Sequence, residues 1–166
     1  MMVLHHLPKV VGDEVDFSPV AQTISSAAAA LKENGVFVLG FQTPIQTASY
    51  WFSQIVPKNC QKVCSRCPTI EFIKECFAKE KLEVKAIFNI MLPLTGETYY
   101  DAESLLTDEM AWAQDSIMSA ADSSEIEKAK EMLQRLQEQG KLEQYVQEND
   151  RIPIHGSGTI IAAVRA

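Results

Sequence analysis

A short apolar run directly after a glycine sets the fold class of this chain. Residues 36–41, which follow Gly35, are all apolar and include two valines and two phenylalanines. Such a run is typical of a strand that is covered on both faces, as in a parallel sheet. Two further segments, residues 84–92, which are mostly apolar, and residues 159–164, predict two more strands. We therefore expect a sheet with helices packed on its faces.

Helical periodicity fills much of the sequence between these runs. The first helix is expected to have Ser18 as its N-cap and to end at Gly35. Ser124 and Glu127 form a capping-box pattern for a long helix that ends at Gly140. Two other segments have a helical pattern, residues 69–82 and 141–148, whereas residues 42–68 are expected to be irregular. Helices alternate with strands, which predicts an α/β fold.

Length and charge limit the functions that this chain can have. Its 166 residues, 46% of them hydrophobic, fit a single domain over residues 1–166. The net charge of -7 argues against nucleic acid and against an anionic membrane as partners. No apolar run is long enough to span a bilayer, and no signal peptide is recognised, so we expect a cytoplasmic protein. The four cysteines are then expected to be free thiols or metal ligands.

Three segments together resemble the class I S-adenosylmethionine-dependent methyltransferases. Residues 2–7 (MVLHHL) resemble the end of the fourth strand of that family. Residues 31–35 (LKENG) resemble the turn before its fifth strand, with Asn34 where the family often has proline or glycine. Residues 156–165 resemble its closing strand. The resemblance covers most of the chain in order and spacing, and together with the apolar start at Met1 it indicates that an N-terminal half is missing.

The resemblance implies a partial Rossmann-like sheet. The family has the strand order 3-2-1-4-5-7-6 with strand 7 antiparallel, and this chain would supply the order 4-5-7-6, with a helical insertion at about residues 103–150. The glycine-rich turn and the acidic residue that hold the cofactor's nucleoside are not found. Gly156 and Gly158 do not replace that turn, because they precede the last strand and no helix follows. The chain's own activity is therefore in question.

The resemblance also implies site residues. Leu4, His5 and His6 would line the S-adenosylmethionine pocket, and His5 could act as a catalytic base. Gln42, Tyr50 and Trp51 follow the fifth strand and could bind a small-molecule acceptor. The bare edge of the strand 4 equivalent would invite a homodimer or a partner chain.

Other interpretations of these residues stay open. His5 and His6 could simply cap a strand end and face solvent, and the aromatic cluster at residues 50–52 could pack a lid onto the core. The whole chain could be a non-enzymatic interaction module or pseudoenzyme. Cys60, Cys64 and Cys67 have the C-x3-C-x2-C spacing of radical S-adenosylmethionine enzymes, which would make the chain an iron–sulfur or zinc protein.

Overall fold

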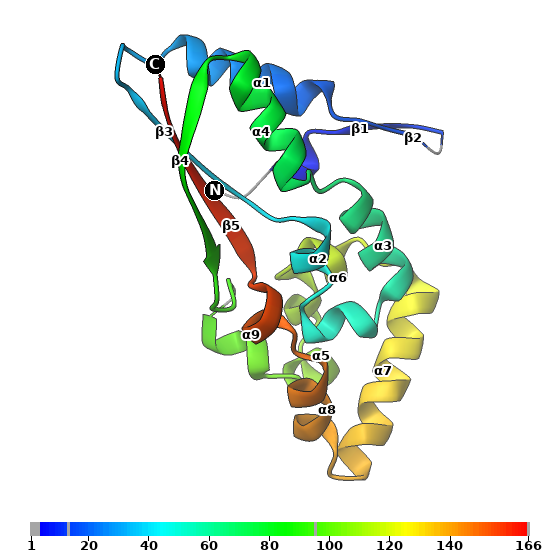
Figure 1. The fold of residues 1–166 in the computed structure, drawn as a ribbon. Helices are drawn as coiled ribbons and strands as arrows, with labels where there is room; N and C mark the ends of the chain where they lie inside the picture. Colours follow the sequence, from blue (N-terminus) through cyan, green and yellow to red (C-terminus); the bar gives the residue numbers. More distant parts are fainter. Residues whose placement is uncertain (1–3, 13, 95, 166) are drawn as a thin grey trace. The chain divides into compact units, whose positions relative to one another are not determined.

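The computed structural model describes residues 4–12, 14–94 and 96–165. The chain divides into two compact units (Figure 1). Unit 1 comprises residues 1–44, 65–90 and 158–166, and unit 2 comprises residues 45–64 and 91–157. The expected insertion at about 103–150 falls within unit 2.

A three-stranded sheet forms the centre of unit 1. The three strands are β3 (Val36–Phe41), β4 (Leu82–Ile90) and β5 (Gly158–Arg165). Their order is β3-β5-β4, and β5 is antiparallel to both neighbours (Figure 1). All three strands were expected, β4 about two residues later than it is found. The fold is thus mixed α/β, with antiparallel pairing in the described sheet.

Two helices cover one face of this sheet. They are α1 (Ser18–Ala29) and α4 (Ile70–Lys79). Their buried side chains form one core with those on the inner face of β3 and β5. The contributing residues are Val20, Ile24, Ala28, Ile73 and Phe77 from the helices and Phe37, Phe41, Ile161 and Ala163 from the strands. Alternate strand residues point to the same face, so the others point away from these helices.

The opposite face of the sheet is apolar and exposed. Val36 and Val38 on β3 are 59% and 63% exposed, and Phe88 on β4 is 58% exposed. Between them lie Ile160 and Ala162 of β5, since the register pairs Val38 with Ala162 and Phe88 with Ile160. β3, whose apolar composition is typical of a strand buried on both faces, is therefore covered on one face only. We call Val36, Val38 and Phe88 the open sheet face.

Unit 1 begins with elements that the sequence did not predict. Residues Leu4–His6 form a short 3-10 helix, η1, and a small antiparallel hairpin follows from β1 (Lys9–Val11) and β2 (Glu14–Asp16). The tail of the strand 4 equivalent was expected within residues 2–7, but residues 4–6 are helical, and residues 2 and 3 lie outside the described residues. The prediction of a bare edge on that strand therefore stays a prediction.

The ends of α1 differ from the expectation. Ser18 is the first residue of the helix rather than its cap, and its backbone N–H and hydroxyl both donate to Asp16, each at 2.8 Å. The helix ends at Ala29, before Gly35. Asn34 adopts the left-handed conformation, with φ of 59°. Gly35 has a different role, because a Cβ atom there would lie 2.7 Å from the Lys32 carbonyl oxygen.

Unit 2 is helical. Its elements are α2 (Pro44–Thr47), η2 (Trp51–Gln54), α3 (Pro57–Ser65), η3 (Gly96–Tyr100), α5 (Ser104–Thr107), η4 (Glu109–Ala113), α6 (Ser116–Ser119), α7 (Ser123–Glu138), α8 (Leu142–Asn149) and α9 (Ile152–His155). Helix α3 was not expected within residues 42–68. No helix in the described part of the chain is both long enough and apolar enough to cross a membrane.

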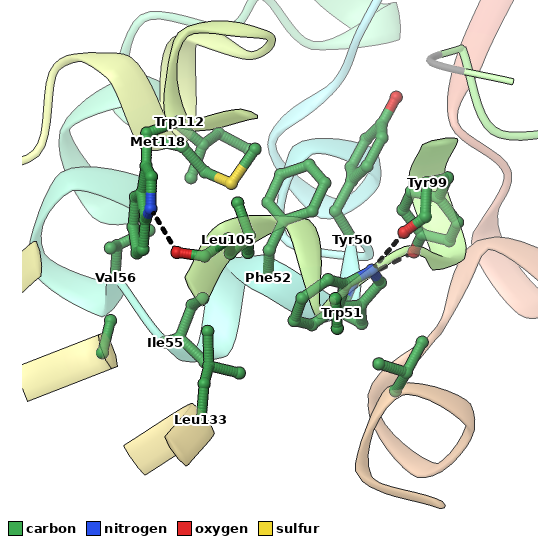
Figure 2. Packing of buried hydrophobic residues seen from close by; sticks show 14 of the residues in the cluster. Tyr50, Trp51, Phe52, Ile55, Val56, Tyr99, Leu105, Trp112, Met118 and Leu133 are labelled. Carbon is green, nitrogen blue, oxygen red and sulfur yellow. Dashed lines mark hydrogen bonds between the residues drawn. The ribbon is translucent and has the colours of Figure 1, made fainter. Parts of the chain in front are cut away.

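The core of unit 2 is built on aromatic side chains. Figure 2 shows Trp51 and Trp112 with their indole N–H groups directed at carbonyl oxygens. Trp112 Nε1 donates to Leu105 O at 2.8 Å. Leu133 of α7 is fully buried in the same cluster. The long helix α7 begins with Asp122 as its N-cap, not with Ser124, because the Asp122 carboxylate accepts a hydrogen bond from Glu125 N at 2.9 Å.

Candidate functional site

His5 is a buried histidine at the start of unit 1. Its side chain is 9% exposed, and its ring centroid lies 4.0 Å from that of His6. Burial, together with the smaller effects of the positive charges of His6 and Arg66, lowers the pKa of His5 from 6.5 to about 4. The imidazole is therefore neutral near pH 7. It can accept a hydrogen bond, but it is a weaker base than an ordinary histidine.

The neighbours of His5 have different environments. Leu4 is buried and belongs to the core of unit 1, whereas His6 is exposed. The structure thus gives Leu4 a packing role and leaves one histidine accessible. The expected contact of Leu4, His5 and His6 with a cofactor stays a prediction.

Three polar residues lie where β3 and β4 end and β5 begins. Gln42 directly follows β3 and is half-buried. Asn89 lies near the end of β4, and its Oδ1 accepts a hydrogen bond from Thr159 Oγ1 at 3.4 Å. Thr159, at the start of β5, pairs with Phe41 and is fully buried. We call Gln42, Asn89 and Thr159 the strand-end cluster. Open α/β sheets bind ligands at the carboxyl ends of their strands.

Sequence reasoning identified Gln42 but missed Asn89 and Thr159. Asn89 lies within one predicted strand and Thr159 at the start of another, where the sequence pattern indicates only strand membership. Their separation of 70 positions hides the pairing from any local pattern. The one available signal was that a polar side chain inside a buried strand needs a partner.

Tyr50 and Trp51 are core residues of unit 2. They are 1% and 2% exposed. Trp51 Nε1 donates to Tyr99 O at 2.7 Å, and Trp51 N donates to the Tyr99 hydroxyl at 3.1 Å (Figure 2). The Tyr50 hydroxyl donates to Ser157 O at 3.4 Å. These contacts support the interpretation of the aromatic cluster as packing.

Tyr99 completes this arrangement as a neutral phenol. Its hydroxyl donates to Asp150 Oδ1 at 2.9 Å. Burial raises the pKa of Tyr99 far above its usual value, and Asp150 raises it further. A cavity of about 20 Å³ beside Trp51 and Tyr99 has room for roughly one water. In this conformation no acceptor molecule fits there, so an acceptor role for Tyr50 and Trp51 would require rearrangement.

The predicted site residues are distributed over both units. His5 and Gln42 belong to unit 1, and Tyr50 and Trp51 belong to unit 2. Each set is therefore a separate candidate.

The cysteines also divide between the units. Cys60 and Cys64 lie one turn apart on α3 in unit 2, with their sulfur atoms 3.7 Å apart, whereas Cys67 belongs to unit 1. Cys76 is buried in the core of unit 1, and burial raises the pKa of its thiol. Among the residues that the structure describes, no group of three or more His, Cys, Asp or Glu side chains is placed to hold a metal ion.

A surface pocket of about 330 Å³ opens on unit 2 beside the start of α3. Ile55, Met132, Lys58 and Lys128 are among the residues that line it. Glu125, also in the lining, is only 5% exposed, because its carboxylate accepts hydrogen bonds from the backbone of α3. The carboxylate is thus already engaged in joining α7 to α3.

Comparison of the chain with models of known protein families, with curated proteins and with solved structures finds no match.

Proposed function

We propose that this chain is the C-terminal portion of an S-adenosylmethionine-dependent methyltransferase that acts on a small molecule. The observation that carries the proposal is the sheet of unit 1. In it, the last strand, β5, lies between β3 and β4 and antiparallel to both. The same arrangement was expected for strands 5, 7 and 6 of that family. Helices α1 and α4, which precede β3 and β4 in the chain, cover the same face.

The strand-end cluster supports a ligand site at one end of this sheet. Because β5 is antiparallel to its neighbours, β3 and β4 run in the same direction and end at the same edge. Gln42, Asn89 and Thr159 provide amide and hydroxyl groups at that edge. Such groups can orient a polar ligand without adding charge.

S-adenosylmethionine would supply an electrophilic methyl group to this site. The residues of this chain would bind its methionine end and orient the acceptor, which by itself contributes much of the rate of a transfer reaction. His5 would remain neutral and accept a hydrogen bond from the nucleophile. The nucleoside would need a glycine-rich turn from another polypeptide segment.

The open sheet face supports the need for that second segment. Val36, Val38 and Phe88 are exposed, although β3, which carries both valines, has the apolar composition of a strand buried on both faces. Helices of a cofactor-binding half would cover this face in a complete enzyme. The proposed function therefore includes association with such a half.

A second candidate is supported by the same face. Large exposed apolar surfaces mark sites of protein association. A non-enzymatic interaction module would use Val36, Val38 and Phe88 to bind a partner and would have no affinity for the cofactor.

Protein-observed NMR with S-adenosylhomocysteine separates the two candidates. We expect millimolar ligand to shift amide signals of residues 5, 42 and 89, and the variant Asn89→Ala to weaken the effect. The control is Glu71→Ala, at an exposed position on α4, which should leave the shifts unchanged. A folded chain that shows no shifts at these positions would contradict the methyltransferase proposal. A stable dimer without any shifts would favour the interaction module.

A further inference from the structure

Two cysteines on α3 form a pair that the proposed function does not use. Cys60 and Cys64 are four residues apart and therefore lie on the same side of the helix. Their sulfur atoms are 3.7 Å apart. Cys60 is buried and Cys64 is half-buried, so the pair is reached from the side of Cys64. We propose that Cys60 and Cys64 together form a two-sulfur binding site for a soft, thiophilic metal or metalloid ion.

The distance between the sulfur atoms matches chelation. Two thiolates bound to a tetrahedral ion at about 2.3 Å lie about 3.8 Å apart. The observed 3.7 Å therefore needs almost no movement of α3. A disulfide is a poorer fit, because it requires Cβ atoms about 3.5–4.5 Å apart. Side chains one helical turn apart have their Cβ atoms about 5–6 Å apart.

Soft ions bind the thiolate form of cysteine, so each of the two thiols gives up its proton when the ion binds.

The chemistry of the site follows from its two ligands. In the described part of the chain, no third His, Cys, Asp or Glu completes a metal-binding group around the pair. An ion held by the two sulfur atoms alone would keep one or more non-protein ligands. A trivalent organoarsenic compound has this property: its oxide reacts with two thiols, two As–S bonds form, and the oxygen leaves as water with both protons. No electron transfer is involved.

Phenylarsine oxide is the probe that we would use on the full chain. With a phosphine reductant present, we expect one adduct per chain, and peptide mapping should place it as a bridge between Cys60 and Cys64. Cys64→Ser should weaken binding by at least about 100-fold, because the second bond of a chelate forms at high effective concentration. Cys67→Ser and Cys76→Ser are the matched controls and should bind as the natural chain does.

Three results would overturn the proposal. One is the absence of a bridged adduct in the natural chain, a result that does not depend on any variant folding. Another is a loss of affinity in Cys67→Ser as large as that in Cys64→Ser, because the site would then need a third sulfur. The last is unchanged affinity in Cys64→Ser when its tryptophan fluorescence shows unit 2 to be folded.

Discussion

Replacing Glu125 with alanine is expected to destabilise unit 2 by about 2–3 kcal/mol. The carboxylate accepts a hydrogen bond from Lys58 N at 2.7 Å and a longer one from Asn59 N at 3.3 Å. Both N–H groups lie in the first turn of α3, where no carbonyl of the same helix can accept them. With alanine at position 125, the two N–H groups would lose their acceptor. Water could not easily replace it, because Glu125 is only 5% exposed.

The magnitude follows from the two bonds. A hydrogen bond to a charged acceptor contributes about 1.5–3 kcal/mol when it is well formed. The bond from Lys58 meets this description, and the bond from Asn59 adds less because it is longer. The higher helix propensity of alanine returns only a few tenths of a kcal/mol. Glu125→Gln keeps an acceptor but loses the charge, so we expect it to cost about 1 kcal/mol.

Urea unfolding followed by tryptophan fluorescence reports on unit 2, where Glu125 lies. Both tryptophans of the chain, Trp51 and Trp112, are buried in unit 2. With a slope of about 1–3 kcal/mol per molar urea, the midpoint for Glu125→Ala should fall by about 1 M. The control is Glu127→Ala, an exposed position on the same helix, with an expected change below about 0.5 kcal/mol. If Glu125→Ala and Glu127→Ala had equal midpoints, the capping role of Glu125 would be refuted.

Three further predictions concern other parts of the chain. Trp51→Phe should destabilise unit 2 by about 1–3 kcal/mol, measured by urea unfolding with Trp112 as the probe, because Tyr99 O loses its buried donor. In an NMR titration, His5 should take up its proton near pH 4. Unit 1 should lose stability as the pH falls from about 6.5 to 4, because His5 in the unfolded chain binds a proton at a higher pH than in the folded chain. A titration midpoint near 6.5 would contradict the burial of His5. Val38→Lys should leave the circular dichroism spectrum unchanged and reduce any self-association seen by sedimentation, since its side chain is 63% exposed; loss of folding would show that this face is covered.

The strands were predictable because their signal is local. Residues 36–41 are apolar at every position, and the strand has the expected bounds. The start of α7 was placed wrongly because two overlapping patterns compete there. Asp122 with Glu125 and Ser124 with Glu127 both fit a cap three residues before an acid. The structure uses the first pair, because Glu125 can then reach the backbone of α3.

The candidate site was less predictable because its contacts are distant in sequence. Asn89 meets Thr159, and Trp51 meets Tyr99, only after the chain has folded. Helix α3 was missed because Pro57 suggested an irregular segment, whereas proline is compatible with the first turn of a helix. Burial of Tyr50 and Trp51 follows from residues 48 positions or more away, which no local pattern contains.

The path of the chain through the two units limits how the protein can be divided. The backbone passes from one unit to the other after residues 44, 64, 90 and 157. The last strand of unit 1 is therefore made only after the whole of unit 2 has been synthesised. A ribosome that stops before residue 158, or a protease that cuts just before it, would remove β5, the strand to which both β3 and β4 are hydrogen-bonded. The sheet of unit 1 can therefore form completely only after all of unit 2 has been made.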